Sequence, residues 1–284
     1  MNRIIVFDYC HGKSVPTCQD TLFIPRVHQF EDIRPAYEAV SRNVFCIWLD
    51  NTLLSLSDIP FDESFEGIPI VLHLYNVGSI YVTLSRLDIL KRLGIRVFLS
   101  SSSRENFSSL KILSSLGIDC GLLIDSERVD DEAFVDLASY YYLSQVPHAT
   151  IEPFDYIWRN LHQEKNLDFS TVYFENPEKY IYVNEALDAA FSEEDLLKGS
   201  FIGNLNEMEK VDFQTMVSKK MTSYYSHFLQ LDDCSKCPNF KICNKKLKTA
   251  FENCSEVFAS VYEYAEIMDS IEQQRGKTKE LCQL

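Results

Sequence analysis

Short apolar runs rich in Val, Ile and aromatic residues recur along the chain, and segments with helical periodicity separate several of them. The runs are RIIVFDY, VFCIWLD, IPIVLHLYN, IRVFLSSS, CGLLIDS, HATIEPF and STVYFEN. The clearest helical segments are Leu84–Leu93, Asn106–Leu116, Asp131–Leu143 and Phe154–Gln163. Strands that alternate with helices are typical of βαβ units, so the sequence predicts an α/β protein with a largely parallel sheet.

Two neighbouring segments resemble each other closely. LKRLGIRVFLSSS and LSSLGIDCGLLIDS both end a predicted helix in Leu-Gly-Ile and then enter a predicted strand. Gly94 and Gly117 stand where a left-handed residue commonly ends a helix. Because the likeness does not extend along the chain, it favours a βα barrel or an open α/β sheet over a solenoid.

Composition limits the classes of partner. The 284 residues include 46% hydrophobic residues, enough to fill a core, and carry 27 basic against 42 acidic side chains, for a formal charge of −15. This charge repels phosphate backbones and anionic lipid surfaces, so we expect no nucleic-acid or membrane partner. No long apolar stretch or secretory segment is evident, which predicts a cytoplasmic protein.

The alternation of apolar runs and helical segments stops near residue 168, where we place a domain boundary. Residues 1–168 hold the βα repeats, and residues 169–284 form the second predicted domain. This second part begins with YFENPEKYIYVNEALDAAF, which is typical of an antiparallel strand pair. A helix near Phe213–Leu229, a cysteine cluster and a C-terminal helix near Phe251–Gln273 follow.

Nine cysteines in a cytoplasmic chain require an explanation, and their odd number argues against a complete disulfide framework. Cys234, Cys237 and Cys243 stand at C-x2-C-x5-C spacing, and Cys254 is the natural fourth ligand of a metal site. The positive charge that could offset four thiolates comes from nearby lysines, Lys236, Lys241, Lys245, Lys246 and Lys248.

A [4Fe–4S] cluster, a zinc ion and no metal remain open for these cysteines. Pro238 after Cys237 is typical of ferredoxin-like ligand runs, which favours the cluster. Zinc ribbons usually present two C-x2-C knuckles, and this region has one. Zinc is therefore the second interpretation.

The segment DDCSKCPNFKIC, preceded by the turn Ile202-Gly203-Asn204-Leu205, resembles the C-terminal SPASM domain of radical-SAM peptide maturases. The resemblance covers roughly residues 170–260 by motif. It implies a degenerate, partial βα barrel for residues 1–168, followed by a small cysteine-rich SPASM-like domain.

The sequence also departs from the family pattern. Leu247 stands where the family has a cysteine, and no cysteine lies between Ile181 and Asp233, so the first auxiliary cluster of the family is lost. The resemblance assigns Cys234, Cys237, Cys243 and Cys254 to the second auxiliary cluster, with Cys282 as a weaker candidate for the last ligand. The C-x3-C-x2-C motif that binds the S-adenosylmethionine cluster is absent from the sequence.

By resemblance, the protein is a radical-SAM-like accessory without radical chemistry. It would act in the maturation of a ribosomally synthesised peptide and bind the precursor peptide, a modifying enzyme such as an ATP-grasp ligase, or both. One alternative is an α/β enzyme acting on a peptide through residues such as His73, His148 and Glu152, with a structural metal site. Another is a zinc-stabilised interaction protein.

Two further groups follow predicted strands. Asp8, Cys10 and His11 come at the end of the first strand, where α/β proteins place functional groups. Ser100 to Arg104 ends another strand and could contact an anion, although a helix-capping loop explains it equally well.

Overall fold

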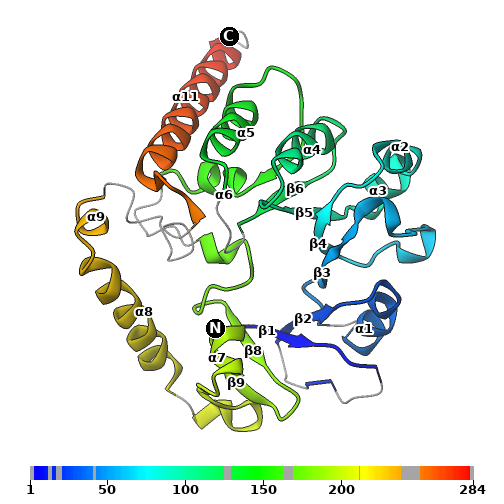
Figure 1. The fold of residues 1–284 in the computed structure, drawn as a ribbon, viewed down its shortest axis with the longest axis vertical. Helices are drawn as coiled ribbons and strands as arrows, with labels where there is room; N and C mark the ends of the chain where they lie inside the picture. The colour runs from blue at the N-terminus through cyan, green and yellow to red at the C-terminus, as the bar shows by residue number, and fades with distance from the viewer. Residues whose placement is uncertain are drawn as a thin grey trace. The chain divides into compact units, whose positions relative to one another are not determined.

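The computed structural model (Figure 1) describes residues 3–11, 15–16, 21–40, 43–124, 129–162, 169–210, 212–237 and 250–281. The chain divides by its internal contacts into two compact units. The first unit consists of Met1–Phe98 and Ser170–Lys236, and the second of Leu99–Phe169 and Cys237–Leu284. The predicted domain division at residue 168 stays a prediction.

The strands confirm the α/β class and its mostly parallel character. In the first unit the strand order is β10-β9-β8-β1-β2-β3-β4. All neighbours from β8 to β4 in this order pair in parallel, and β8–β9 and β9–β10 pair antiparallel. In the second unit β6 and β7 pair in parallel, while β5 crosses the division between the units. The strands are β1 (Ile4–Asp8), β2 (Leu22–Val27), β3 (Ile47–Ser55), β4 (Ile70–Asn76), β5 (Arg96–Ser100), β6 (Cys120–Leu123), β7 (Ile151–Glu152), β8 (Tyr180–Val183), β9 (Asp188–Ala190) and β10 (Gly203–Asn204).

The helices connect these strands and extend the C-terminal part. The α-helices are α1 (Ile33–Val40), α2 (Ile80–Ser85), α3 (Leu87–Leu93), α4 (Arg104–Ser115), α5 (Asp131–Leu143), α6 (Phe154–Arg159), α7 (Glu193–Leu197), α8 (Phe213–Leu229), α9 (Asp232–Ser235) and α11 (Cys254–Leu281). Short 3-10 helices lie at Phe30–Asp32, Leu56–Asp58, Glu63–Phe65, Phe169–Thr171 and Leu205–Lys210. No helix in these described ranges is both long enough and apolar enough to cross a membrane.

Local sequence signals explain several helix boundaries. Asp130 caps α5 because its side chain accepts the N–H of Ala133, and the helix covers the predicted range. Gly94 and Gly117 follow α3 and α4 with φ of 61° and 82°, the left-handed conformation expected of them. The two glycines therefore mark the ends of α3 and α4, as the sequence predicted.

One predicted strand is wrong. The run STVYFEN overlaps the 3-10 helix Phe169–Thr171 and contains no strand. Phe174 has a φ of 61°, and its ring lies 5.5 Å from that of Trp48 and 5.6 Å from that of Tyr180. The aromatic residues that suggested a strand instead pack against β3 and β8 of the first unit.

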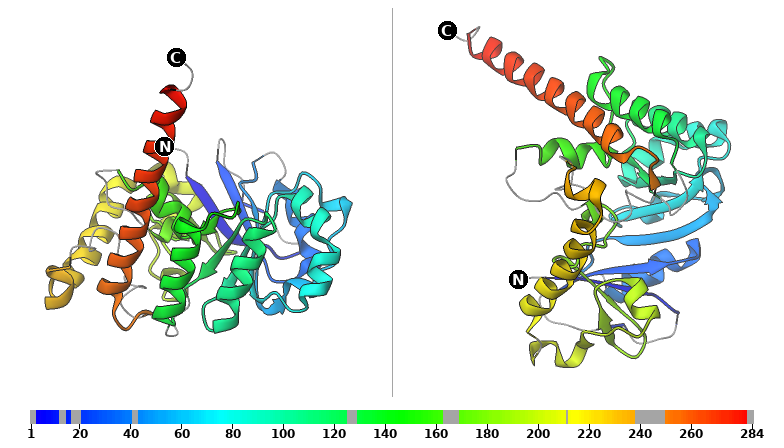
Figure 2. Two further views of the ribbon diagram at one scale, coloured as in Figure 1. Left: turned by 90° about the horizontal axis from the view of Figure 1, so that it is seen from above. Right: turned by 60° about the vertical axis from the view of Figure 1, so that its left-hand side comes forward.

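In the second unit, part of the core lies between α5 and α11, which lie side by side (Figures 1 and 2). Phe134 of α5 packs its ring 4.9 Å from Phe251 and 5.9 Å from Phe258. Asp131 accepts the backbone N–H of Asn253 at 2.9 Å, just before α11 begins. Apolar packing and this hydrogen bond together fix the start of the C-terminal helix.

Candidate functional site

The strongest candidate site lies in the first unit, where the parallel strands β1, β2 and β8 end. The carboxyl ends of parallel strands meet at one edge of a sheet, where α/β proteins usually bind ligands. Asp8, the last residue of β1, pairs in register with Arg26 of β2. The two side chains therefore project from the same face, within reach of each other.

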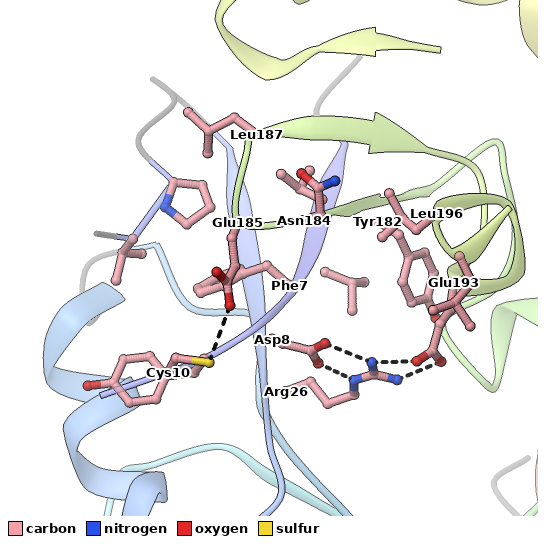
Figure 3. Close-up of a pocket in the computed structure, with 16 residues that line it drawn as sticks. Phe7, Asp8, Cys10, Arg26, Tyr182, Asn184, Glu185, Leu187, Glu193 and Leu196 are labelled. Carbon is pink, nitrogen blue, oxygen red and sulfur yellow. Dashed lines mark hydrogen bonds and ion pairs between the residues drawn. The ribbon is translucent and has the colours of Figure 1, made fainter. Parts of the chain in front are cut away.

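Arg26 is the centre of this site. Its side chain is only 9% exposed and binds two carboxylates, each through two hydrogen bonds (Figure 3). Nε and Nη2 donate to Asp8 at 2.5 and 3.1 Å, and Nη1 and Nη2 donate to Glu193 at 2.6 Å each. Glu193 is the first residue of α7, so this arginine ties α7 to β1 and β2.

The charges around Arg26 influence each other. Burial opposes the positive charge, but the hydrogen bonds that Arg26 donates to Glu193 and Asp8, and the negative charges of these carboxylates, outweigh it and raise the pKa of Arg26. Asp50 of β3 lies 3.6 Å from the guanidinium. Burial raises the pKa of Asp50, although Arg26 and His28 act in the opposite direction. The site thus holds three carboxylates around one cation, and the third is poorly compensated.

This imbalance predicts the pH dependence of an Asp50→Asn variant. A carboxyl group whose pKa is raised in the folded state binds more protons there than in the unfolded chain. Its ionisation therefore destabilises the fold as pH rises from the ordinary pKa of 3.8 through the raised pKa. The amide of the substituted side chain cannot ionise. Relative to wild type, the variant should therefore gain free energy of unfolding in urea titrations as pH rises above 3.8. A relative loss with rising pH would show instead that attraction by Arg26 outweighs burial at Asp50.

A pocket of about 400 Å³ opens over this ion-pair network. Its polar lining includes Asp8, Arg26, Glu193, Glu185 and Cys10 (Figure 3). Its apolar lining comes largely from Val15, Pro16, Leu187, Leu196 and Leu197. A lining that combines charged groups with neighbouring aliphatic groups is typical of a pocket that orients a ligand.

The loop after β8 supplies one wall of this pocket. Asn184 accepts the backbone N–H of Leu187 at 3.0 Å through its carbonyl, and its side-chain oxygen accepts the N–H of Asp188 at 2.9 Å. This tight turn carries Glu185, whose carboxylate lies 4.0 Å from the Cys10 sulfur. Glu185 therefore reaches the pocket from the side opposite Glu193 (Figure 3).

Two of the three residues predicted after the first strand belong to this site. Asp8 and Cys10 line the pocket. His11 is exposed and is not among the lining residues. The main residues that sequence reasoning missed are Arg26, Asp50, Glu185 and Glu193. The signal for Arg26 was a charged residue within the apolar run LFIPRV, since a buried cation requires a partner.

The predicted metal ligands are described in part. Cys234 is buried in α9, and Cys254 begins α11. The Cys237 thiol lies 3.7 Å from the Ser255 hydroxyl, which places it beside the helix end that carries Cys254. Cys243 lies outside the described residues, as does the weaker candidate Cys282.

The described ranges contain no group of three His, Cys, Asp or Glu side chains that could hold a metal ion. Because one of the four predicted ligands is outside those ranges, the four-cysteine site stays a prediction. The six described cysteines, Cys10, Cys46, Cys120, Cys234, Cys237 and Cys254, are free of disulfides.

The other predicted groups have structural partners. His73 is buried in the first unit, with its ring 4.9 Å from Trp48 and its Nδ1 3.8 Å from Asp50. In the second unit, His148 packs between Tyr140 and Tyr141, and Glu152 accepts the N–H of Tyr156 at 3.1 Å.

The serine-rich strand end leads into α4, but Ser103 at the N-cap of this helix forms no side-chain capping hydrogen bond. The hydroxyls of Ser100 and Ser102 lie 2.6 Å apart. Arg104 at the start of α4 forms an ion pair with Asp130 at 3.3 Å. These contacts occupy the polar groups that suggested a contact with an anion.

Comparisons with known proteins do not assign the chain to a family. No protein-family model matches the chain, and no curated protein matches it in sequence.

Proposed function

We propose that the protein is a non-radical accessory in the maturation of a ribosomally synthesised peptide and that it binds the precursor peptide. The observation that carries this proposal is the pocket at the ends of β1, β2 and β8, which combines fixed charges with an aliphatic wall. Peptides present both polar and apolar side chains, so such a pocket suits one side chain of an extended segment.

The resemblance of residues 170–260 to SPASM domains supplies the biological context of the proposal. In this view residues 1–168 form a degenerate partial βα barrel, and residues 169–284 form a SPASM-like domain. Cys234, Cys237, Cys243 and Cys254 would hold a [4Fe–4S] cluster, with zinc as the alternative. Four thiolates leave no iron site open, so the cluster would stabilise the C-terminal part rather than react.

The sequence lacks the cysteine motif needed for radical chemistry, so the proposed role is binding. A separate enzyme, such as an ATP-grasp ligase, would modify the bound peptide. The protein would present that peptide or hold it in register. This division of work requires no catalytic residue in the pocket.

A display selection tests the proposal. The full-length protein is immobilised and exposed to a library of randomised twelve-residue peptides of about 10¹² members, and the selected peptides are resynthesised and titrated by fluorescence anisotropy. We expect selected peptides to bind with micromolar affinity and to be recovered with unchanged mass. Failure to select any peptide would refute the proposal, and a mass change would support the enzyme alternative.

A matched pair of variants locates the binding site. Leu197 lines the pocket and is 83% exposed, whereas Leu53 is 91% exposed and is not among the lining residues. Both tolerate substitution because little packing is lost. Leu197→Lys should weaken binding by about tenfold or more, since it puts a bulky charged side chain at the pocket, and Leu53→Lys should leave binding unchanged. Equal effects of the two variants would remove the pocket from the proposal.

A further inference from the structure

We infer that the pocket recognises a basic side chain, lysine or arginine, of the bound peptide. This inference rests on the proposed function and gives it a substrate class. It follows from the charge of the lining, from the geometry of Arg26 and from the aliphatic wall.

The lining carries more negative than positive charge. Among the lining residues that the structure describes, Asp8, Glu185 and Glu193 contribute three carboxylates and Arg26 contributes one guanidinium, which gives these residues a formal charge of −2. Asp50 adds a further carboxylate close to Arg26. A concave site with an excess of one sign of charge raises the local concentration of ligands with the opposite sign.

Arg26 itself is poorly suited to bind an anionic ligand. Its nitrogens already donate four hydrogen bonds to Asp8 and Glu193, and its side chain is nearly buried. An anion would have to displace one of these carboxylates. The arginine instead holds both carboxylates in place before a ligand arrives.

The two carboxylates retain capacity for a cation. The side chains of Asp8 and Glu193 are 48% and 47% exposed, although both bind Arg26. A carboxylate offers about four lone-pair positions, so each has acceptor sites beyond its bonds to Arg26. Because their orientation is already fixed, binding a cation there costs little further conformational entropy.

Glu185 provides a third acceptor from the facing wall. Its carboxylate lines the pocket and lies 4.0 Å from the Cys10 sulfur. A basic group between Glu185 and the Asp8–Glu193 pair would meet carboxylates on two sides. Charge-assisted hydrogen bonds of this kind are about twice as strong as neutral ones.

The aliphatic part of the lining determines the shape of the ligand. Leu187, Leu196 and Leu197 lie beside the charged groups. Lysine and arginine carry a charged end on a methylene stem, and such stems pack well along apolar surface. A small inorganic cation would leave this wall unused. The combination therefore favours a basic side chain.

The test compares synthetic peptides that differ at one position. A selected peptide is made with lysine or with norleucine, which keeps the aliphatic stem but lacks the charge, and both are titrated against the full-length protein. We expect the norleucine peptide to bind about tenfold more weakly. Equal affinities would overturn this inference while leaving peptide binding, and thus the proposed function, intact.

Two conservative variants assign the effect to the pocket. Glu185→Gln should reduce the preference for lysine over norleucine about threefold, because it removes one of the three carboxylates of the pocket while Asp8 and Glu193 remain. Glu194→Gln is the matched control. Glu194 is exposed, pairs with Lys198 and is not among the lining residues, so its loss changes the net charge nearby but not the pocket. If both variants changed the preference equally, the preference would arise from the net charge of the region and not from the pocket. That result would overturn the assignment of lysine recognition to the pocket.

A free diamine is the other source of the same chemistry, and cadaverine serves as the probe. It carries ammonium groups on a methylene stem without a peptide backbone. We expect cadaverine to compete with the lysine peptide only at concentrations at least about a hundredfold above the peptide Kd, because the backbone contacts are missing. Binding of cadaverine as tight as that of the peptide would overturn the peptide assignment in favour of a small amine.

Discussion

Arg26→Met is expected to lower the free energy of unfolding by about 3 kcal/mol, which is the lower end of the range for removing one partner of a buried ion pair. Arg26 is the cation that Asp8, Asp50 and Glu193 share, and methionine fills a similar volume without its charge. The cost stays near the lower end because Asp8 and Glu193 are about half exposed, so water can replace part of the lost interaction. Urea titrations followed by circular dichroism measure the change.

A surface arginine provides the control for this prediction. Arg92 forms an ion pair with Glu63 at 2.8 Å, and both side chains are well exposed. Arg92→Met should therefore cost less than about 1 kcal/mol. If Arg26→Met cost no more than Arg92→Met, the network around Arg26 would not stabilise the fold.

A second variant separates the charge effect from packing. Adding Glu193→Gln to Arg26→Met removes one of the carboxylates that lost its partner. The double variant should recover part of the loss, so that the two substitutions are not additive. Additive costs would mean that Arg26 stabilises the protein through its aliphatic stem and its contact with Trp48, 5.4 Å from the guanidinium carbon to the ring centre.

The elements that sequence reasoning predicted well carry their own boundary signals. Helix α5 combines a capping Asp130 with a regular apolar period, and both its ends agree with the prediction. Helix α8 also covers its predicted range. Strands β8 and β9 form the antiparallel pair expected from YFENPEKYIYVNEALDAAF. In each case the information lies within the segment itself.

The elements that were missed contain residues that usually break or oppose the local pattern. Strand β2 includes Pro25 and Arg26, and both argue against a buried central strand. Helix α1 includes Pro35, which a helix tolerates in its first turn. The predicted helix Leu84–Leu93 is divided in the structure, since α2 ends at Ser85 and α3 begins at Leu87. Tertiary packing decides these cases.

The site could be predicted only in part, because its residues meet through strand order. Asp8 ends a recognisable strand and Cys10 follows it, so their place at a sheet edge could be expected. Glu193 is 167 positions from Arg26 in the sequence. They meet because β8 pairs with β1, and α7 then follows β9 back to the same edge. No local period encodes that return of the chain.

The cysteine prediction has the other large expected effect. Anaerobically purified full-length protein should contain about four iron and four sulfide per chain, with the broad visible absorption of a [4Fe–4S] cluster. Cys237→Ala should abolish both the iron content and the absorption, because three thiolates leave the cluster open to loss. Cys237 is the predicted ligand to test first, since its thiol lies 3.7 Å from the Ser255 hydroxyl at the start of α11, the helix that Cys254 begins.

Cys10→Ala is the matched control for this experiment. Cys10 is also a partly exposed free cysteine, but it lies in the pocket of the first unit. Its replacement should leave iron and sulfide unchanged. If the protein contained one zinc per chain and no iron, the site would be a structural zinc site and not a cluster. If wild type and Cys237→Ala contained equal iron, Cys237 would not be a ligand. The peptide selection does not depend on metal content, so neither result would decide whether the pocket binds a peptide. The display selection tests that proposal separately.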